Sequence, residues 1–218
     1  MPKAVLTINS RNYGAWSMRC WLMCRLSSLE FEEKIVSADD ASTRAELLQL
    51  SPSFLVPSLE IGDVKVWDTL AIAEYLNETQ PASPLLPEQP GARAHCRSVS
   101  AELHGGFQNL RSAMPMNIKR RHNSFKLWSG VEPDIERVTE IWRECLTRYR
   151  GPWLFGPRPT MADAMYAPEC TRFRTYGKTL DTTCERYIDT VLDCPEVQEW
   201  VAKAIAEPDA LVELEGEF

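Results

Sequence analysis

Short segments of strand and helix type alternate along the first third of the chain. Residues 3–8 have an apolar strand pattern, and residues 31–36 form a second predicted strand. Residues 16–26 repeat apolar side chains at helical spacing, and residues 41–50 form another helix pattern that stops at Ser51-Pro52. Because a helix pattern lies between the first two strands, we predict that they pair in parallel through a βαβ crossover.

A hairpin followed by a helix occupies residues 51–76, SPSFLVPSLEIGDVKVWDTLAIAEYL. Residues 58–61 and 64–67 are predicted strands joined by a tight turn at Gly62-Asp63. Asp68-Thr69 then opens a helix with apolar residues at roughly helical spacing. The predicted order is therefore β-α-β-α-β-β-α, an α/β layer whose last two strands are antiparallel.

The pattern changes once, at residues 80–90, where QPASPLLPEQP holds four prolines in 11 residues and predicts a linker. Beyond it the strong patterns are helical. They include an amphipathic helix over residues 135–149, a capping-box start from Thr160 to Asp163, and a helix that begins at Pro195. We predict an α/β domain over residues 1–79, the linker over residues 80–90, and an all-α domain over residues 91–218.

Charge and composition narrow the function classes. The 218 residues are 44% hydrophobic and carry a net charge of −7, which argues against nucleic acid or an anionic membrane as a partner. No apolar run reaches the roughly 20 residues that span a bilayer, and the first residues are too polar for a signal peptide. We expect a cytoplasmic protein.

The cysteines and histidines predict no metal site. The seven cysteines include no Cys-x-x-Cys pair, and none of the three histidines has metal-ligand spacing from a cysteine pair. Reduced, packed thiols are the expectation. Cys20 and Cys24 lie four residues apart on one helix face, where a redox pair is the alternative to core packing.

Two features of residues 51–76 suit a ligand. Pro57 lacks an N–H, so the backbone of Val56 is less committed to a sheet ladder. The helix start at Asp68-Thr69 offers free N–H groups, a hydroxyl and a carboxylate, which together match the charged end of an α-amino acid. The alternative is that Asp68 is only an N-cap, worth about 1 kcal/mol.

At this point five segments become recognisable, and the chain resembles the cytosolic glutathione transferases over nearly its whole length. VPSLEIGDVKVWDTLAIAEYL resembles their glutathione-binding segment, and GPWLFGPRPTMADAMYAP their capping-box and hydrophobic-staple helix. NYGAWSMRCWL is similar to the first helix of a bacterial-type branch that usually reads Asn-Tyr-Ser-Ser-Trp-Ser-Leu-Arg. ELHGGFQNLRSAMPMN and TRFRTYG resemble the same branch.

The resemblance implies a thioredoxin-like α/β domain, an all-α domain, a homodimer, and glutathione as co-substrate without a metal. It implies a cis Pro57, a Val56 backbone that pairs with the cysteinyl part of glutathione, and an Asp68-Thr69 pair that holds the γ-glutamyl end. Leu55 stands where the family often has a lysine for a glutathione carboxylate. Losing such a contact removes about 1.5–3 kcal/mol of binding unless another cation compensates.

The reactive end also departs from the family pattern. Such enzymes stabilise the glutathione thiolate, because a free thiol with a pKa of about 8.5 is mostly protonated at neutral pH. Gly14 and Ala15 stand where the branch usually has two serines. We expect Tyr13 or Asn12 to be the thiolate partner, or else the backbone N–H groups of residues 14–16. Ser10 and Ser17 flank this turn.

By resemblance, residues of the helical domain form the wall of the electrophile pocket. The candidates are His104, Phe107 and Arg111, spaced three and four apart on one predicted helix, and Tyr176, near Arg172 and Phe173, on another. A helix packing face is the alternative. We expect a glutathione transferase that acts on a small electrophile, in the manner of detoxification enzymes; the alternatives are a binding protein with little conjugating activity or a glutathione-dependent isomerase.

Overall fold

The computed structural model describes residues 3–36, 56–122, 126 and 128–208. The helix predicted at residues 41–50 and the candidate site residue Leu55 lie outside the described residues. The first part of the chain forms these elements: β1 (Ala4–Ile8), α1 (Ala15–Leu26), β2 (Phe31–Ile35), β3 (Ser58–Ile61), β4 (Val64–Trp67) and α3 (Thr69–Thr79).

The four strands form one mixed sheet in the order β2-β1-β3-β4. Strand β1 is parallel to β2 and antiparallel to β3, and β3 and β4 form the predicted antiparallel hairpin. Ser58 pairs with both Thr7 and Trp67, so the chain before β3, the chain after β1 and the chain after β4 meet at one end of the sheet. The sheet therefore brings Pro57, Asp68 and the β1–α1 loop together.

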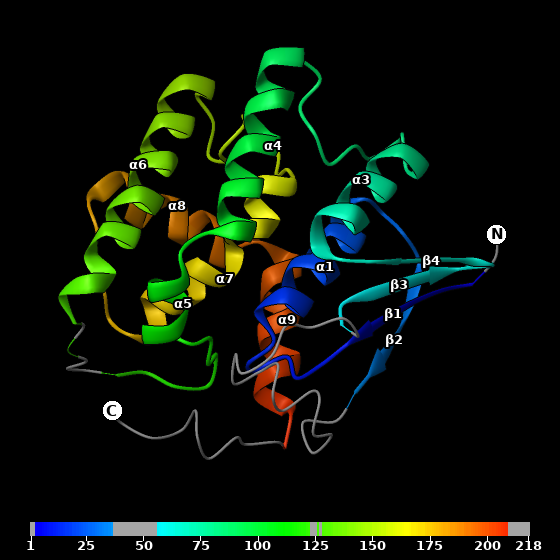
Figure 1. Ribbon diagram of the computed structural model, residues 1–218, viewed down its shortest axis with the longest axis horizontal. Coiled ribbons are helices and arrows are strands. Elements are labelled where there is room, and N and C mark those ends of the chain that lie inside the picture. Colours follow the sequence, from blue (N-terminus) through cyan, green and yellow to red (C-terminus); the bar gives the residue numbers. More distant parts are fainter. Residues whose placement is uncertain (1–2, 37–55, 123–125, 127, 209–218) are drawn as a thin grey trace.

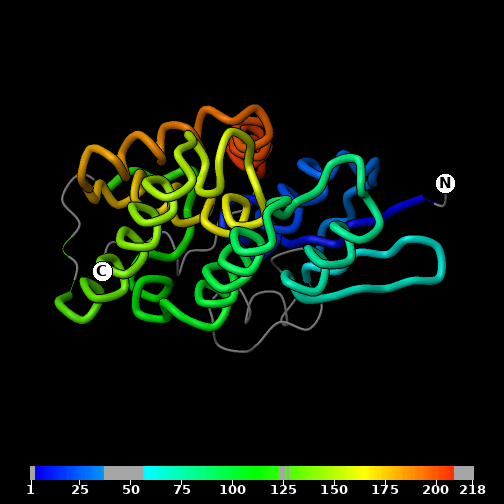
Figure 2. The backbone as a smooth tube through the Cα atoms, turned by 90° about the horizontal axis from the view of Figure 1, so that it is seen from above, coloured from blue at the N-terminus to red at the C-terminus, as the bar shows by residue number. Residues whose placement is uncertain are grey.

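Helices make up the rest of the described chain and lie beside the sheet domain in both views (Figures 1 and 2). They are α4 (Pro90–Gly105), α5 (Gln108–Ala113), a 3-10 turn η1 (Ser129–Val131), α6 (Glu132–Tyr149), α7 (Met161–Thr175), α8 (Thr182–Leu192) and α9 (Pro195–Ala206). The predicted fold class, an α/β domain followed by a helical domain, is confirmed.

One helix prediction was wrong. His104, Phe107 and Arg111 do not share a helix, because α4 ends at Gly105 and α5 begins only at Gln108. Between them Phe107 has a left-handed backbone, with φ of 58° and ψ of 37°. The i, i+3, i+7 spacing continued across Gly105-Gly106, where a helix readily ends, so the periodicity concealed a break.

Helix α7 is buried along nearly its whole length, and a capping box fixes its start. The Thr160 N–H and hydroxyl donate to Asp163 Oδ2 at 2.8 and 2.9 Å. Leu154 N–H and Tyr187 OH donate to Asp163 Oδ1 at 3.0 and 3.1 Å. Burial raises the pKa of Asp163, while these hydrogen bonds act in the opposite direction. The predicted capping box is confirmed.

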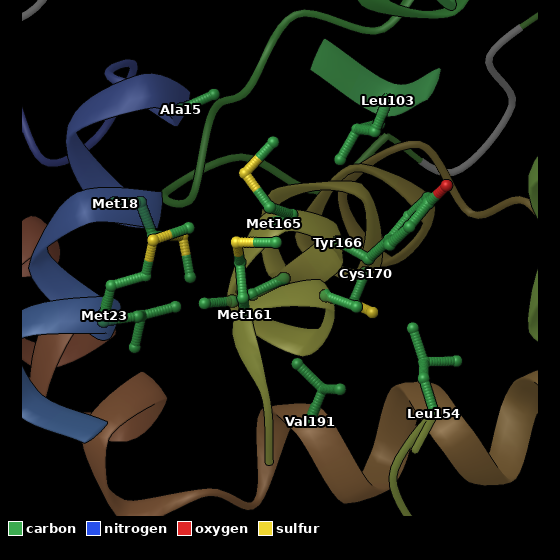
Figure 3. Packing of buried hydrophobic residues seen from close by; sticks show 14 of the residues in the cluster. Ala15, Met18, Met23, Leu103, Leu154, Met161, Met165, Tyr166, Cys170 and Val191 are labelled. Atoms are coloured by element: carbon green, nitrogen blue, oxygen red, sulfur yellow. The ribbon is translucent and has the colours of Figure 1, made fainter. Parts of the chain in front are cut away.

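Helix α1 packs directly on α7, which joins the two domains. Met18 and Met23 of α1 face Met161 and Met165 of α7 across this contact (Figure 3). All four side chains are almost fully buried. Methionine side chains are flexible and fill irregular gaps, so they suit a surface where two domains meet.

The seven cysteines are free and buried, as expected of packed thiols. Burial raises the pKa of Cys20 to about 12 and that of Cys24 well above its usual range, so neither thiol is activated. In the described part of the chain, no group of His, Cys, Asp and Glu side chains could hold a metal ion. None of the described helices has the length and apolar character needed to span a bilayer.

Candidate functional site

The peptide bond between Val56 and Pro57 is cis, as the resemblance implied. Both residues are buried, and Val56 is 3% exposed. Because β3 starts at Ser58, beside both β1 and β4, Pro57 lies between the end of β1 and the beginning of α3. This places the expected contacts for the cysteinyl and γ-glutamyl parts of glutathione next to each other.

Asp68 uses both of its carboxylate oxygens. Oδ1 accepts hydrogen bonds from Leu70 N–H at 2.9 Å and Ala71 N–H at 3.3 Å, so Asp68 is the N-cap of α3. Oδ2 lies 3.0 Å from Nε2 of His104 on α4. The Asp68 backbone has a positive φ of 75°, a sparsely populated conformation for a residue other than glycine. Asp68 is therefore more than a cap: it also connects the two domains.

Thr69, which follows Asp68, is 2% exposed. Its side chain lies close enough to Cys20 of α1 to act against the burial that raises the pKa of that thiol, and α1 packs on α3. The start of α3 is thereby held against α1, so the predicted γ-glutamyl site and the first helix form one structural unit.

The β1–α1 loop holds Asn12 in a fixed orientation. Asn12 is 0% exposed, and its Oδ1 accepts a 3.0 Å hydrogen bond from the N–H of Lys119. The Asn12 carbonyl accepts a second hydrogen bond, 3.3 Å long, from Ile118 N–H. The Nδ2 donor of Asn12 has no acceptor among the described residues. Tyr13, next in the loop, is 5% exposed.

Two of the three backbone N–H groups expected to be available at the start of α1 already donate hydrogen bonds. Gly14 N–H donates to the Ser10 carbonyl at 2.8 Å, and Ala15 N–H donates to the Tyr13 carbonyl at 3.0 Å. The flanking serine hydroxyls are also engaged. Ser17 donates to Asn9 Oδ1 at 2.7 Å, and Ser10 donates to Glu207 at 2.9 Å. Among the side chains expected to contact the thiolate, Asn12 has a buried N–H donor, Nδ2, without an acceptor in the described part of the chain.

Gly14 leaves no room for the serine that the related branch has there. A Cβ atom on Gly14 would lie 2.4 Å from the Ser10 carbonyl oxygen and 2.0 Å from Asn9 Oδ1. A side-chain tip can move, but the backbone carbonyl cannot move without reshaping the loop. The loop conformation therefore accepts glycine at position 14 and excludes the serine of the related branch.

We therefore expect Gly14→Ser to lower the free energy of unfolding by about 2 kcal/mol, within the range for overpacked sites, and not to raise the reaction rate. Urea denaturation and a rate assay with a fixed electrophile measure both. Gly105→Ser is the matched control, because a Cβ there meets nothing within 4 Å. A stable Gly14→Ser variant with a faster reaction would show that the loop adapts to serine.

A buried cluster of charges lies where α1 meets α7. Arg19 Nη2 is 2.8 Å from Oε1 and 3.0 Å from Oε2 of Glu169, and both side chains are 0% exposed. Arg172, on the same helix as Glu169, has its Nε 3.7 Å from Glu169 Oε1. Arg111 of α5 is close enough that Arg19 and Glu169 both affect its pKa. We call Arg19, Arg111, Arg172 and Glu169 the arginine cluster.

The arginine cluster carries more positive than negative charge. Burial lowers the pKa of Arg172 to about 10, Glu169 opposes this shift, and Arg19 and Arg111 add to it. Burial, followed by repulsion from Arg19, likewise lowers the pKa of Arg111, while Glu169 and Asp134 oppose the shift. Nη1 of Arg19 and Nε of Arg172 have no hydrogen-bond acceptor among the described residues. Buried guanidinium groups with unused donors suit an anion.

Trp16 connects the arginine cluster to the Asp68 site. The guanidinium carbons of Arg19 and Arg111 lie 4.3 and 5.3 Å from the centroid of the Trp16 ring. The His104 ring meets Trp16 edge-on, with 5.1 Å between centroids, and reaches Asp68 on its other side. Asp68, His104, Trp16 and Arg111 therefore form a continuous chain of contacts across the domain boundary.

Two predicted pocket residues are buried and packed against other parts of the chain. The Tyr176 hydroxyl donates to the Pro115 carbonyl at 3.0 Å, and its ring stacks on His122 with 5.0 Å between centroids. Phe107, between α4 and α5, is 8% exposed. Their role in substrate binding stays a prediction.

Sequence reasoning missed Arg19, Glu169 and Glu207 as site residues. Arg19 lies inside the NYGAWSMRCWL segment, so its motif was a usable signal. Glu169 and Glu207 stand in no motif that marks them. Their importance comes from partners that are about 150 and 196 residues away in sequence.

Comparison with known proteins gives matches over both domains. Residues 13–79 match the family model described as glutathione S-transferase, N-terminal domain, and residues 124–203 match that of the C-terminal domain. A Caenorhabditis elegans protein named "Probable maleylacetoacetate isomerase" is 27% identical over 196 residues, which cover 88% of this chain and 90% of that protein. Glutathione S-transferase 1 of Dianthus caryophyllus is 30% identical over 157 residues, covering 71% and 70%.

Solved structures agree at the level of the fold. The crystal structure of a glutathione transferase homolog from Burkholderia, with bound glutathione, superimposes with a TM-score of 0.70 at 20% identity. The match covers 94% of this chain and 98% of that one.

Proposed function

Because the chain belongs to the glutathione S-transferase family, a family of glutathione-dependent enzymes, we propose that it catalyses attack by the glutathione thiolate on a small electrophile that carries a carboxylate. The observation that carries this proposal is the arginine cluster, in which Glu169 pairs with Arg19 and Arg172 and the charge of Arg111 lies close by. The surplus positive charge favours an anionic second substrate.

Glutathione binds, in this proposal, along the end of the sheet. The backbone of Val56, next to cis Pro57, pairs with the cysteinyl part of the tripeptide. Asp68 and Thr69 bind the γ-glutamyl amino and carboxylate groups. Support comes from the strand register, which brings Pro57 and Asp68 side by side.

The thiolate partner we propose is Asn12. Its Oδ1 is occupied by the Lys119 N–H, which directs the unpartnered Nδ2 donor away from Lys119. A hydrogen bond to the charged form of a group lowers its pKa, so this donor would favour the thiolate over the thiol. Tyr13, adjacent in the loop, is the second candidate.

The electrophile site we propose is bounded by His104, Phe107 and Arg111, with Tyr176 behind them. Arg111 supplies the charge and a guanidinium fork that fits a carboxylate. Trp16 supports the Arg111 guanidinium from its ring face and meets His104 edge-on. A substrate in this position would lie between the Asp68 site and the arginine cluster.

Arg111→Ala tests the proposal. Since a charge-assisted hydrogen bond contributes about 1.5–3 kcal/mol, we expect KM for a carboxylate-bearing electrophile to rise at least tenfold. KM for a neutral activated aryl chloride should stay within a factor of two. Steady-state kinetics of both substrates at saturating glutathione measure this difference.

Two controls accompany the Arg111 variant. Arg143→Ala removes an exposed arginine of α6 that pairs with Asp181 and should change neither KM. Arg111→Lys keeps the charge without the fork and should recover part of the loss. Equal losses for the charged and the neutral substrate would contradict an anion-binding role.

A glutathione-dependent isomerisation is the second candidate, favoured by the maleylacetoacetate isomerase name of a relative that matches 88% of this chain. Both reactions begin with addition of the thiolate to the electrophile. An isomerase then expels the thiolate and regenerates glutathione, whereas a transferase retains the new C–S bond. Thiol titration during turnover distinguishes them, because only conjugation consumes glutathione.

We propose a cytoplasmic homodimer as the working form. Free, buried cysteines accord with a reducing compartment. Size-exclusion chromatography with light scattering tests the dimer; a monomeric mass at micromolar concentration would contradict it.

A further inference from the structure

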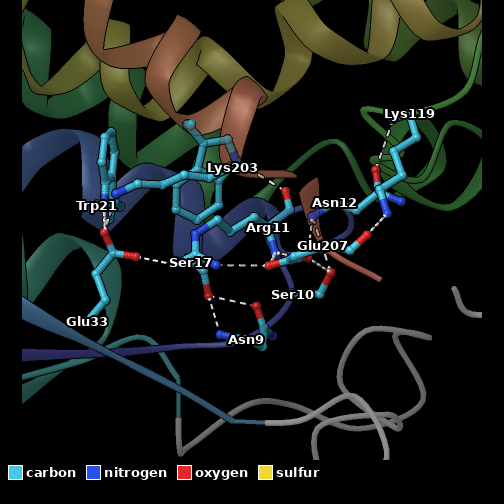
Figure 4. Close-up of polar contacts among 11 residues, drawn as sticks. Asn9, Ser10, Arg11, Asn12, Ser17, Trp21, Glu33, Lys119, Lys203 and Glu207 are labelled. Carbon is cyan, nitrogen blue, oxygen red and sulfur yellow. Dashed lines mark hydrogen bonds and ion pairs between the residues drawn. The ribbon is translucent and has the colours of Figure 1, made fainter. Parts of the chain in front are cut away.

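The carboxylate of Glu207, just beyond the end of α9, accepts hydrogen bonds from the loop between β1 and α1. Its oxygens accept hydrogen bonds from the Arg11 N–H at 2.9 Å and the Asn12 N–H at 3.3 Å. They also accept the Ser10 hydroxyl at 2.9 Å and the Arg11 guanidinium at 3.1 Å. The Glu207 side chain is 10% exposed. Figure 4 shows these bonds converging from three consecutive loop residues.

Glu207 also contacts Lys119, the residue whose N–H bonds to the Asn12 side chain. The Lys119 ammonium group donates to the Glu207 backbone carbonyl, while the Lys119 N–H donates to Asn12 Oδ1 at 3.0 Å. Glu207 therefore fixes the Asn12 backbone through its carboxylate and supports the Asn12 amide group through Lys119 (Figure 4). Both contacts determine where the unpartnered Nδ2 donor of Asn12 points.

A second set of bonds fixes α9 against this loop. The Trp200 indole N–H donates to the Arg11 carbonyl at 3.1 Å. Lys203 pairs at 2.7 Å with Glu33, and Arg11 pairs with the same carboxylate. Burial alone would raise the pKa of Glu33, but hydrogen bonds from Lys203, Trp21 and Arg11 lower it. The Glu33 carboxylate therefore stays charged at neutral pH, and α9 is a rigid support for Glu207.

We propose that Glu207 is a positioning residue for thiolate formation: it holds Asn12 so that Nδ2 donates to the sulfur of bound glutathione. This inference rests on the proposed function and deepens it. Glu207 does not touch the glutathione in this arrangement. Its carboxylate is paired with the Arg11 guanidinium, which limits its repulsion of the thiolate.

The experiment measures ionisation of bound glutathione directly, by thiolate absorbance from pH 5 to 9, in wild type and three variants. We expect Glu207→Ala to raise the pKa of the bound thiol by about one pH unit, which is a tenfold loss of thiolate. The kcat near neutral pH should fall by about the same factor. KM for glutathione should stay within a factor of two, because the Asp68 site is unchanged.

Two further variants separate positioning from stability. Glu207→Asp keeps a carboxylate and should recover part of the kcat. Glu207→Gln has the same size as glutamate but one acceptor oxygen fewer, and should be intermediate. The control is Glu140→Gln, which breaks an exposed ion pair of α6 with Arg137 and should leave the thiol titration unchanged.

Each outcome decides between the two proposals. Suppose that the wild-type protein lowers the thiol pKa of glutathione and that the three Glu207 variants lower it equally. Glu207 is then only structural, so this inference fails while the proposed function stands. A lower melting temperature without a change in titration leads to the same conclusion. If wild type binds no glutathione at millimolar concentration, the proposed function fails and this inference with it.

Discussion

Glu169→Gln lowers the free energy of unfolding by about 3–5 kcal/mol, the cost of removing one partner from a buried ion pair. The substitution leaves Arg19, Arg111 and Arg172 close together without the carboxylate of Glu169. Arg19 and Glu169 are 0% exposed, so water cannot replace the lost charge. Since these two residues join α1 to α7, the loss also weakens the contact between the domains.

Urea denaturation followed by circular dichroism measures this effect as a lower midpoint at a similar slope. The control is Glu74→Gln, which breaks the Arg97 ion pair, whose side chains are 44% and 38% exposed. Such a surface pair contributes about 0.2–1 kcal/mol. A loss below about 1 kcal/mol for Glu169→Gln would show that the cluster relaxes or admits water.

A double variant gives a further check. Replacing both members of a buried pair by apolar residues is often neutral, because no uncompensated charge remains between them. Arg172 loses Glu169 in this variant, but the charge of Arg19 is gone as well. Arg19→Leu combined with Glu169→Leu should therefore be more stable than the sum of the single losses predicts. A double-mutant cycle on these positions measures the coupling.

Asp68→Ala weakens glutathione binding by about a hundredfold, the upper part of the range for a lost charge-assisted contact. In the proposed site the Asp68 carboxylate binds the ammonium of the γ-glutamyl group. The variant also loses the bonds to Leu70 and Ala71 and the contact with His104. Isothermal titration calorimetry with glutathione measures the affinity.

The control for Asp68 is Asp181→Ala, because Asp181 caps α8 in the same way. Its Oδ1 accepts hydrogen bonds from Thr183 N–H at 3.0 Å and Cys184 N–H at 3.2 Å, and it lies outside the proposed site. Both variants lose a cap worth about 1 kcal/mol, but only Asp68→Ala should lose affinity for glutathione. If the two variants bind glutathione with equal affinity, Asp68 serves only as the N-cap of α3 and as a contact between the domains.

The resemblance of residues 51–76 to the family implied the cis Pro57 bond, whereas the hairpin and the Asp68-Thr69 helix start were predicted from that segment itself. This succeeded because the hairpin and the capped helix are local structures, decided by the order of turn, strand and cap residues. The helix break at Gly105-Gly106 was missed because periodicity continues across a break in the backbone. The availability of the Gly14 and Ala15 amides was misjudged for a similar reason, since only the loop conformation shows that Ser10 and Tyr13 already accept them.

The amino-acid sequence determined the family, the order of the described strands and the helix start at Asp68-Thr69. These follow from motifs whose members lie within a few residues of each other. The tertiary structure decided which charges meet. Arg19 finds Glu169, and Arg11 finds Glu207, across separations of 150 and 196 residues. Such pairs form only when distant parts of the chain pack together, so no local sequence pattern predicts them. The arginine cluster and the contact of Glu207 with the Asn12 loop both depend on these pairs.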